Sequence, residues 1–520
     1  MLKDIKNIVV VSLSTVGSRI LGLMRDVLIF AALGASRWND AFILALTLPN
    51  LFRRLLGEGA LTSAMVPVFS DVLKRSGRAQ AFGFLNQVLL RLFAVLILLV
   101  VGGMLLLGLL ASSRLLPEKW VLGADLSVIL LPYMIFICLA AIVSAGLNLV
   151  GRFAVAASAP MLLNISMIGA LLIGMWLEDE PGRIVYWLCG GVLFGGFLQL
   201  VVPTCDLTYQ GWRPKRGERL EAEIAELWKL FVPGLMGAAI LQINILVSRL
   251  LAYSLDESAV SVLYLASRLM ELPLGIFTIA IATVFFPTLA HAVSDKDDRT
   301  FAKSFVQGMR LTIGLSLPAG IGLIVLGEPI LELFRWGNFN SDQVALTLPL
   351  IAIYGLGLPF YSASTFATRG LHACKDMRSP VRVAGLCLLI NLISGIVLMQ
   401  FLGAIGLAIS NVLAAIIQAV CLWRALTGQR GGLNELPLRG AFIKIATSGI
   451  AMGLVCMIGD QALLSFGLSA KTYALVTFCL LIPACVVIYF AILYCLKFEE
   501  LKLLTAYLNR RIVGRKNIKT

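Results

Sequence analysis

Four arginines lie in stretches of this sequence that otherwise have the composition of membrane-spanning helices: Arg19, Arg25, Arg53 and Arg268. A cation at the centre of a bilayer costs at least a few kcal/mol, so such residues usually face a helix-bundle interior or a water-filled cavity. The guanidinium group keeps its charge at physiological pH and binds phosphate oxygens through two parallel hydrogen bonds. Since few acidic residues lie nearby, the pattern predicts a cavity that receives an anion, and a diphosphate suits it.

Polar residues accompany these arginines at spacings that place them on one helix face or an adjoining one. Ser18 precedes Arg25 by seven residues, and Arg19 precedes Asp26 by seven. We expect Asp26 and Glu271 to orient arginines rather than to carry protons. The supporting polar residues that we predict for the cavity are Ser18, Asp26, Asp40, Asn50, Glu58, Ser261 and Glu271.

Arginines near helix ends need no cavity, because their side chains reach the interface while the stem stays in lipid. That interpretation fits Arg249, Arg310, Arg369 and Arg382. Arg53 lies toward the expected cytoplasmic end of the second span, so a cavity role competes with an interfacial one there.

The composition is that of a polytopic membrane protein. Of the 520 residues, 59% are hydrophobic and 14% charged, against roughly 25% charged in average soluble proteins. The net charge of +14 fits cytoplasmic loops that follow the positive-inside rule, so no nucleic acid partner is predicted. The ten cysteines form no CxxC pair and only two histidines occur, so we expect neither a disulfide framework nor a metal site.

Hydropathy predicts an all-α fold with fourteen membrane-spanning helices, the first retained rather than cleaved as a signal peptide. Lys and Arg gather in the loops on one side, which places both termini in the cytoplasm. The expected spans are 8–33, 39–58, 82–111, 127–149, 159–177, 184–205, 228–252, 258–290, 305–333, 344–371, 381–401, 403–424, 437–462 and 471–496.

The two halves of the chain resemble each other at a nearly constant spacing. Pro67 corresponds to Pro287 and Pro160 to Pro380 at the same offset, whereas the offset from Pro49 to Pro273 is about one helical turn longer. Six spans fit in one period, so both halves have the same orientation. This predicts two six-helix lobes related by a pseudo-two-fold axis along the membrane normal, with the binding site between them.

The predicted domains follow from this repeat. They are an N-terminal lobe (1–205), a cytoplasmic linker with an amphipathic helix (206–227), a C-terminal lobe (228–427), two further spans (428–496) and a basic cytoplasmic tail (497–520). The arginines are concentrated in the first lobe, whose second span is about one turn longer than its counterpart. We therefore expect the first lobe to bind the charged end of a ligand.

Several segments resemble the MurJ (MviN) family of lipid II flippases, in the multidrug/oligosaccharidyl-lipid/polysaccharide exporter superfamily. The motifs are Gly17-Ser18-Arg19 through Arg25-Asp26, Leu48-Pro49-Asn50-Leu51-Phe52-Arg53-Arg54, Glu58-Gly59-Ala60 and Ser267-Arg268-Leu269-Met270-Glu271-Leu272-Pro273. The resemblance extends in order along essentially the whole chain. Thr47 and Ser267 depart from the common pattern, which leaves the headgroup contacts and the coupling ion open.

The resemblance implies a transporter, not an enzyme, of the bacterial inner membrane. Its substrate would be the undecaprenyl-diphosphate-linked disaccharide-pentapeptide of peptidoglycan synthesis, moved to the periplasmic leaflet by alternating access. Arg19, Arg25, Arg53 and Arg268 would bind the substrate, and the last two spans would line a groove for the lipid tail. No cofactor is implied, but transport would couple to the membrane potential or a monovalent cation. The expected partners are lipid II and membrane lipids, the expected state is a monomer, and the cell-wall synthesis machinery is a candidate partner.

Other functions remain open at this stage. An O-antigen-type flippase would share the fold, and so would a cation-coupled drug antiporter, although an antiporter should carry net acid in its cavity. A polyprenyl-phosphate glycosyltransferase would need a metal-binding loop, for which Asp295-Lys296-Asp297-Asp298 is the sole candidate. A structural scaffold would not need arginines inside the membrane.

Overall fold

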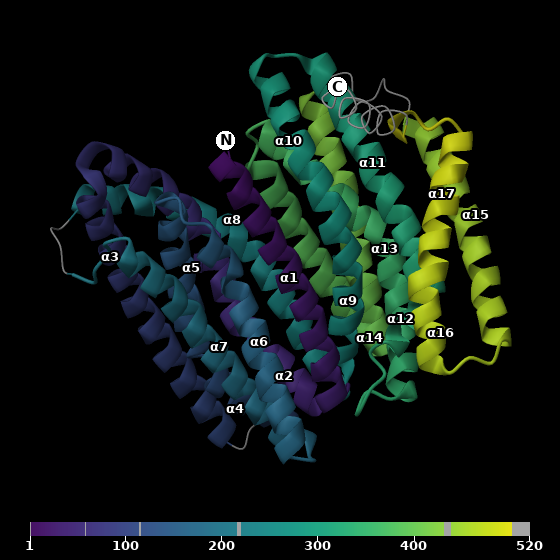
Figure 1. The fold of residues 1–520 in the computed structure, drawn as a ribbon, viewed down its shortest axis with the longest axis horizontal. Helices are drawn as coiled ribbons and strands as arrows, with labels where there is room; N and C mark the ends of the chain where they lie inside the picture. The colour runs from purple at the N-terminus through teal and green to yellow at the C-terminus, as the bar shows by residue number, and fades with distance from the viewer. Residues whose placement is uncertain (1, 58, 114–115, 216–219, 431–437, 502–520) are drawn as a thin grey trace, which may run out of the picture. The chain divides into compact units, whose positions relative to one another are not determined.

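The computed structural model describes the chain except residues 1, 58, 114–115, 216–219, 431–437 and 502–520. Every regular element in these described ranges is a helix (Figure 1), which confirms the predicted fold class. The chain forms two compact units: unit 1 contains residues 1–261 and 336–340, and unit 2 contains residues 262–335 and 341–520.

The helices of unit 1 are α1 (Leu2–Leu33), α2 (Arg37–Phe52), the π-helical turn η1 (Arg53–Gly57), α3 (Ala60–Ser112), α4 (Glu118–Leu130), α5 (Tyr133–Leu149), α6 (Ala154–Leu177), α7 (Pro181–Tyr209) and α8 (Glu221–Tyr253). Those of unit 2 are α9 (Ala259–Pro273, which begins in unit 1), η2 (Leu274–Thr278), α10 (Ile279–Ser294), α11 (Asp298–Val325), α12 (Gly327–Glu332), α13 (Ser341–Ala373), α14 (Arg378–Gln429), α15 (Leu438–Ser465), α16 (Ala470–Val476), η3 (Thr477–Leu481) and α17 (Ile482–Cys495).

Two of the longest helices are each two helices joined at a glycine. Gly77 in α3 has φ 78° and Gly403 in α14 has φ 55°, a conformation that glycine adopts without the steric cost of a side chain. By length and composition, ten helical stretches of the described chain could cross a membrane, or eleven if the pair α4 and α5, bent by 42°, is one span. This count leaves both long helices undivided and omits α1; dividing the two helices and adding α1 to the eleven gives fourteen spans, a number that stays a prediction.

The second span does not end at residue 58 as predicted. Its helical path continues from α2 through η1 and, after Gly59, along α3 as far as the break at Gly77. The span therefore does not end between η1 and α3. Consequently Arg53, the first residue of η1, lies within a longer helical path and not near the end of the span.

Unit 2 contains a matching feature, because the π-helical turn η2 interrupts the path from α9 to α10. The two π-helical turns begin at Arg53 and Leu274, an offset close to that of the sequence repeat, and Pro67 and Pro287 follow them. Proline removes a backbone donor, and π turns often mark functional sites in helices. Their common position agrees with the internal repeat read from the sequence.

The linker before α8 differs from its prediction. Residues 221–229 form the first turns of one continuous helix, α8, rather than a separate amphipathic helix. This helix packs on α2 and α3 and belongs to unit 1. The compact units therefore divide the chain after Ser261, whereas the division into repeat lobes at residue 228 stays a prediction.

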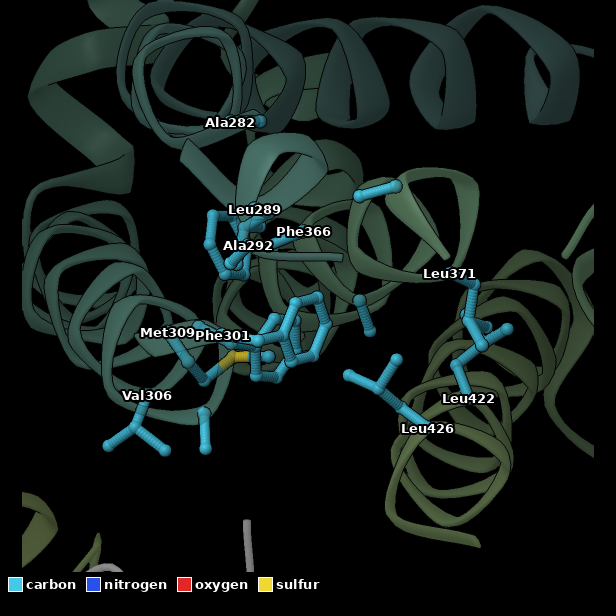
Figure 2. Packing of buried hydrophobic residues seen from close by; sticks show 14 residues of the cluster. Ala282, Leu289, Ala292, Phe301, Val306, Met309, Phe366, Leu371, Leu422 and Leu426 are labelled. Atoms are coloured by element: carbon cyan, nitrogen blue, oxygen red, sulfur yellow. The ribbon is translucent and has the colours of Figure 1, made fainter. Parts of the chain in front are cut away.

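Unit 2 is held together by aromatic and aliphatic side chains from four helices. Phe301 and Phe305 of α11 stack with their ring centroids 6.1 Å apart, and Phe305 contacts Phe366 of α13. Figure 2 shows Phe301 and Phe366 in the same cluster as Leu289 of α10 and Leu426 of α14. At one edge of the unit, α15 and α17 pack together (Figure 1), and the hydroxyl of Tyr489 donates to the carbonyl of Gly314 in α11 at 2.6 Å.

Polar side-chain contacts stabilise the connections between helices in both units. In unit 1, Arg152 pairs with Asp206 at 2.8 Å. In unit 2, Asp376 accepts from the backbone N–H groups of Arg378 and Ser379 and from the side chain of Gln429. Partial burial acts to raise the pKa of Asp376, but these hydrogen bonds outweigh burial and lower the pKa to about 2. The carboxylate therefore stays ionised and caps α14 across physiological pH.

Close approach of helix backbones makes one glycine of unit 2 irreplaceable. A Cβ at Gly320 of α11 would overlap the carbonyl oxygen of Gly355 in α13, whereas a Cβ at Gly322 meets nothing within 4 Å. Small residues permit such helix contacts in membranes. We expect Gly320→Ala to destabilise the protein by about 1–3 kcal/mol, and Gly322→Ala to be neutral or stabilising. Thermal unfolding in detergent, followed by fluorescence, would measure both, and equal melting temperatures would contradict this packing.

Candidate functional site

A buried ion pair lies in α1, where Asp26 pairs with its chain neighbour Arg25 and not with Arg19, the residue that the seven-residue spacing placed on its face. Nε and Nη2 of Arg25 donate to the same oxygen of Asp26, Oδ1, at 3.1 and 2.7 Å. The side chain of Asp26 is 1% exposed and that of Arg25 is 14% exposed. A buried pair of this kind does little for stability, but losing either partner leaves a costly buried charge. Asp26 therefore holds the guanidinium group in place while neutralising much of its charge.

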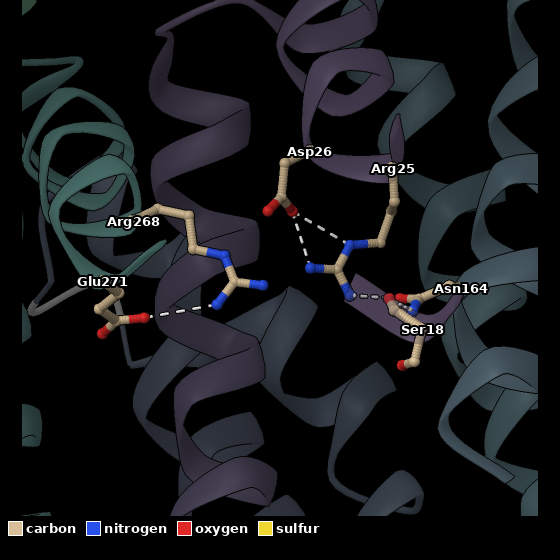
Figure 3. A network of polar contacts seen from close by, with 6 residues as sticks. All are labelled: Ser18, Arg25, Asp26, Asn164, Arg268 and Glu271. Carbon is tan, nitrogen blue, oxygen red and sulfur yellow. Dashed lines mark hydrogen bonds and ion pairs between the residues drawn. The ribbon is translucent and has the colours of Figure 1, made fainter. Parts of the chain in front are cut away.

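A third residue completes this arrangement from α6. Nη1 of Arg25 donates to Oδ1 of Asn164 at 2.9 Å, and Nδ2 of Asn164 donates to the backbone carbonyl of Ser18 at 3.1 Å (Figure 3). We call Arg25, Asp26 and Asn164 the α1–α6 cluster. Ser18 contributes its carbonyl to it rather than the hydroxyl group that the sequence suggested. Asn164 was not predicted as a site residue, although an amide within an apolar span was a signal.

Apart from Asp40, the other predicted residues of the first spans are less buried than Asp26. Arg19 lies on an exposed side of α1, and Asn50 and Arg53 are half-buried. Arg54, the next residue of η1, is exposed. Glu58 lies outside the described residues.

In unit 2, Arg268 and Glu271 pair on α9 as their three-residue spacing predicts. Nη1 of Arg268 lies 3.4 Å from Oε2 of Glu271, and the side chains are 36% and 52% exposed (Figure 3). Exposed pairs of this type contribute little to stability. The guanidinium group thus stays partly accessible. The gathering of all four arginines around one cavity stays a prediction.

The sequence also predicted Asp40 and Ser261, and the structure joins these two residues although they are far apart in the chain. Asp40 is fully buried, and its Oδ1 accepts from the backbone N–H of Ser261 at 2.8 Å and from the Ser261 hydroxyl group. Ser261 is the third residue of α9, so the carboxylate binds at a helix N-terminus, where N–H groups lack intrahelical partners and negative charge is favoured. We call this contact the α2–α9 tie.

Lys119 supports the α2–α9 tie from α4. Its Nζ lies 3.6 Å from Oδ2 of Asp40 and donates to the carbonyls of Leu255 and Asp256 at 2.9 and 3.0 Å. It also lies 4.7 Å from the centre of the Tyr253 ring. Lys119 was not predicted as a site residue. Nothing in its local sequence indicates Asp40, which belongs to a distant part of the chain.

A five-residue strap, Trp336–Asn340, belongs to unit 1 although unit 2 flanks it on both sides. The backbone N–H and Nδ2 of Asn338 donate to the carbonyls of residues 31 and 32 at 2.8 and 2.7 Å. Gly34 and Ser36 donate to the neighbouring carbonyls of residues 30 and 33. The last four carbonyls of α1, which lack intrahelical partners, are thereby all satisfied.

Ligands for a metal do not gather in the part of the chain that the structure describes, which contains no group of three His, Cys, Asp or Glu suited to hold an ion. The guanidinium groups of Arg25 and Arg268 offer cationic hydrogen bonding.

Comparison with known proteins gives concordant matches. A family model described as Lipid II flippase MurJ matches residues 29–484. A probable lipid II flippase MurJ of Rhizobium meliloti is 32% identical over 501 residues, covering 94% of this chain and 93% of the relative. Its counterpart in Vibrio cholerae is 32% identical over 494 residues, covering 91% and 92%.

Solved structures agree with these relatives. A lipid II flippase MurJ in an inward closed conformation aligns with a TM-score of 0.76 at 26% identity, covering 97% of this chain and 100% of the other. An inward-facing multidrug resistance MATE family transporter aligns with a TM-score of 0.64 at 14% identity, covering 80% and 96%. The second likeness shows a shared fold alone.

Proposed function

Because this chain belongs to the MurJ family of lipid II flippases, we propose that it moves lipid II from the cytoplasmic to the periplasmic leaflet of the bacterial inner membrane by alternating access. It is a transporter and not an enzyme, as the family assignment establishes. The observation that carries the proposal is the family match, which includes Arg53 and Arg268 of the four substrate-binding candidates and begins after Arg19 and Arg25.

Charge supports a diphosphate as the group that is bound. Among the described candidates, four arginines outnumber the carboxylates, of which Asp26 pairs with Arg25 and Glu271 with Arg268, whereas Asp40 lies beside Lys119. This excess of positive charge suits an anionic group such as the diphosphate of a polyprenyl-linked precursor. In this proposal the half-buried and exposed guanidinium groups bind the phosphates, and the α1–α6 cluster provides a fixed donor.

The polyprenyl tail stays in lipid while the headgroup crosses. In unit 2, Leu480 of η3 and Val487 of α17 are 66% and 67% exposed, whereas Tyr489 and Leu493 pack inward on α11 and α15. An apolar outer face on the last two spans supports the proposal that they line a groove for the tail. No cofactor takes part, and both termini lie in the cytoplasm.

The α2–α9 tie and the strap are the proposed conformational contacts. Ser261 is the last residue of unit 1 before the chain enters unit 2, and the strap interrupts unit 2. Movement of unit 2 therefore acts on both segments through the covalent chain. We propose that the two contacts hold in one state of the transport cycle and loosen in the other.

The membrane potential would assist the cycle. Moving a charge across the full field is worth about 2.3 kcal/mol per 100 mV. An emptied cationic site is drawn toward the negative cytoplasmic side, which favours its return to the inward-facing state. A monovalent cation is the alternative coupling species. The protein acts as a monomer in this scheme, with the cell-wall synthesis machinery as a candidate partner.

Transport is tested in bacteria depleted of their own lipid II flippase. Lipid II in the outer leaflet is measured with an external reagent that modifies its headgroup, with and without expression of this chain. We expect expression to restore both the labelled lipid II and growth. If the membranes contain the folded protein and lipid II still stays unlabelled, the proposed function is contradicted.

A further inference from the structure

We propose that Asn164 is a positioning residue for substrate binding: its amide fixes the orientation of the Arg25 guanidinium group and keeps the α1–α6 cluster electrically neutral. The inference deepens the proposed function and rests on it. Asn164 itself need not touch the substrate, because its effect passes through Arg25.

The hydrogen bonds determine which way the amide points. An arginine side chain offers donors alone, and a backbone carbonyl is an acceptor alone. Oδ1 of Asn164 must therefore face Nη1 of Arg25, at 2.9 Å, and Nδ2 must face the carbonyl of Ser18, at 3.1 Å. Reversing the amide would break both bonds. The amide thus links the Arg25 side chain to the Ser18 carbonyl, both in α1, and its own orientation is fixed.

Asp26 and Asn164 hold the guanidinium group through different nitrogens. Asp26 receives Nε and Nη2 on one side, and Asn164 receives Nη1 (Figure 3). Because all three nitrogens donate hydrogen bonds, the guanidinium plane cannot rotate without breaking at least one of those hydrogen bonds. A fixed guanidinium plane loses less entropy when it binds a phosphate, which raises affinity.

The backbone behind Asn164 is rigid enough for this role. A Cβ at Gly195 of α7 would lie 2.9 Å from Cα of Leu163, the residue before Asn164. A Cβ at Gly191 would lie 2.6 Å from Cβ of Ala170. Helices α6 and α7 therefore pack backbone to backbone at this level, and Asn164, which is 6% exposed, projects toward α1 from a fixed base.

Charge explains why an amide suits this position better than a carboxylate. Arg25 and Asp26 form a neutral pair, and Asn164 adds a hydrogen bond without adding charge. An aspartate at position 164 would keep the size of the side chain and its acceptor for Arg25. It would also add a negative charge beside the substrate site and place an oxygen where Ser18 needs a donor. An anionic substrate should then bind more weakly although Arg25 stays in place.

A cycle of variants tests this inference with the purified protein in nanodiscs. The variants are Asn164→Asp, Asp26→Asn and the double variant that exchanges the two groups, and the readouts are the Kd for lipid II and the melting temperature. Asn164→Asp should weaken binding by at least about tenfold, and its uncompensated buried charge should also lower the melting temperature. The double variant, which restores one carboxylate and one amide beside Arg25, should bind within about threefold of the wild type.

Two controls separate positioning from folding. Asn164→Leu removes both hydrogen bonds without adding charge and should also weaken binding, whereas Ile165→Ala, on the exposed side of α6, should not. A merely structural role for Asn164 predicts no rescue in the double variant, and that outcome would overturn the inference, as would wild-type affinity in Asn164→Asp. If the wild type itself does not bind lipid II, the proposed function fails first.

Discussion

Replacing Arg25 by glutamine abolishes support of growth in cells that depend on this protein. The substitution removes the charge and the fork geometry of the guanidinium group, and it leaves Asp26 as a buried carboxylate without its cation. Loss of two charge-assisted bonds to the substrate costs about 3 kcal/mol, which corresponds to a reduction in affinity of about a hundredfold. The rate at which lipid II becomes accessible to an external probe measures the effect.

An arginine outside the proposed site provides the matched control. Arg183, at the start of α7, is 69% exposed and pairs with Glu178 and Glu180 on the surface. Arg183→Gln should leave transport unchanged. Arg25→Lys keeps the charge but loses the fork, so it should retain only part of the activity. Normal transport by Arg25→Gln would remove Arg25 from the proposed mechanism.

Replacing Asp40 by asparagine should destabilise unit 1 and slow transport. The carboxylate is fully buried, caps the N-terminus of α9 and faces Lys119, which is 16% exposed. Removing one partner of a buried pair costs about 3 kcal/mol, because the remaining charge is left uncompensated. The melting temperature in detergent and the transport rate in cells should therefore both fall.

The partner variant distinguishes loss of charge from loss of shape. Lys119→Gln combined with Asp40→Asn removes both charges and leaves hydrogen-bonding groups of similar size. The double variant should therefore be more stable than Asp40→Asn alone, as coupled pairs in a mutant cycle are. If the losses of stability caused by the two substitutions instead add, the ion pair contributes nothing to stability. The α2–α9 tie then depends on hydrogen bonds alone.

Much of the fold follows from local sequence. Hydropathy located the helices, and it separated the two halves of α14 at Gly403, within one residue of the predicted boundary. It failed where charge and glycine interrupt a helix without ending it. Arg53, Arg54 and Glu58-Gly59 suggested the end of a span, yet helix resumes at Ala60 because the interruption is confined to a π-helical turn and a short break.

The site was predictable where its contacts are local. The three-residue spacing of Arg268 and Glu271 correctly indicated their pairing. The partners of Arg25 and Asp40 could not be found in this way, since Asn164 is 139 residues from Arg25 and Ser261 is 221 residues from Asp40. Periodicity places a residue on a helix face, but it does not tell which other helix that face meets.

The claim that arginines recognise a diphosphate is tested most directly by asking whether the protein binds a ligand with two phosphates more tightly than a ligand with one. Binding of undecaprenyl diphosphate and undecaprenyl monophosphate to the wild type and to Arg25→Gln in nanodiscs isolates this charge from the sugars and the peptide. The account predicts that the wild type prefers the diphosphate by at least about tenfold and that Arg25→Gln loses this preference. An equal preference in both proteins would contradict it.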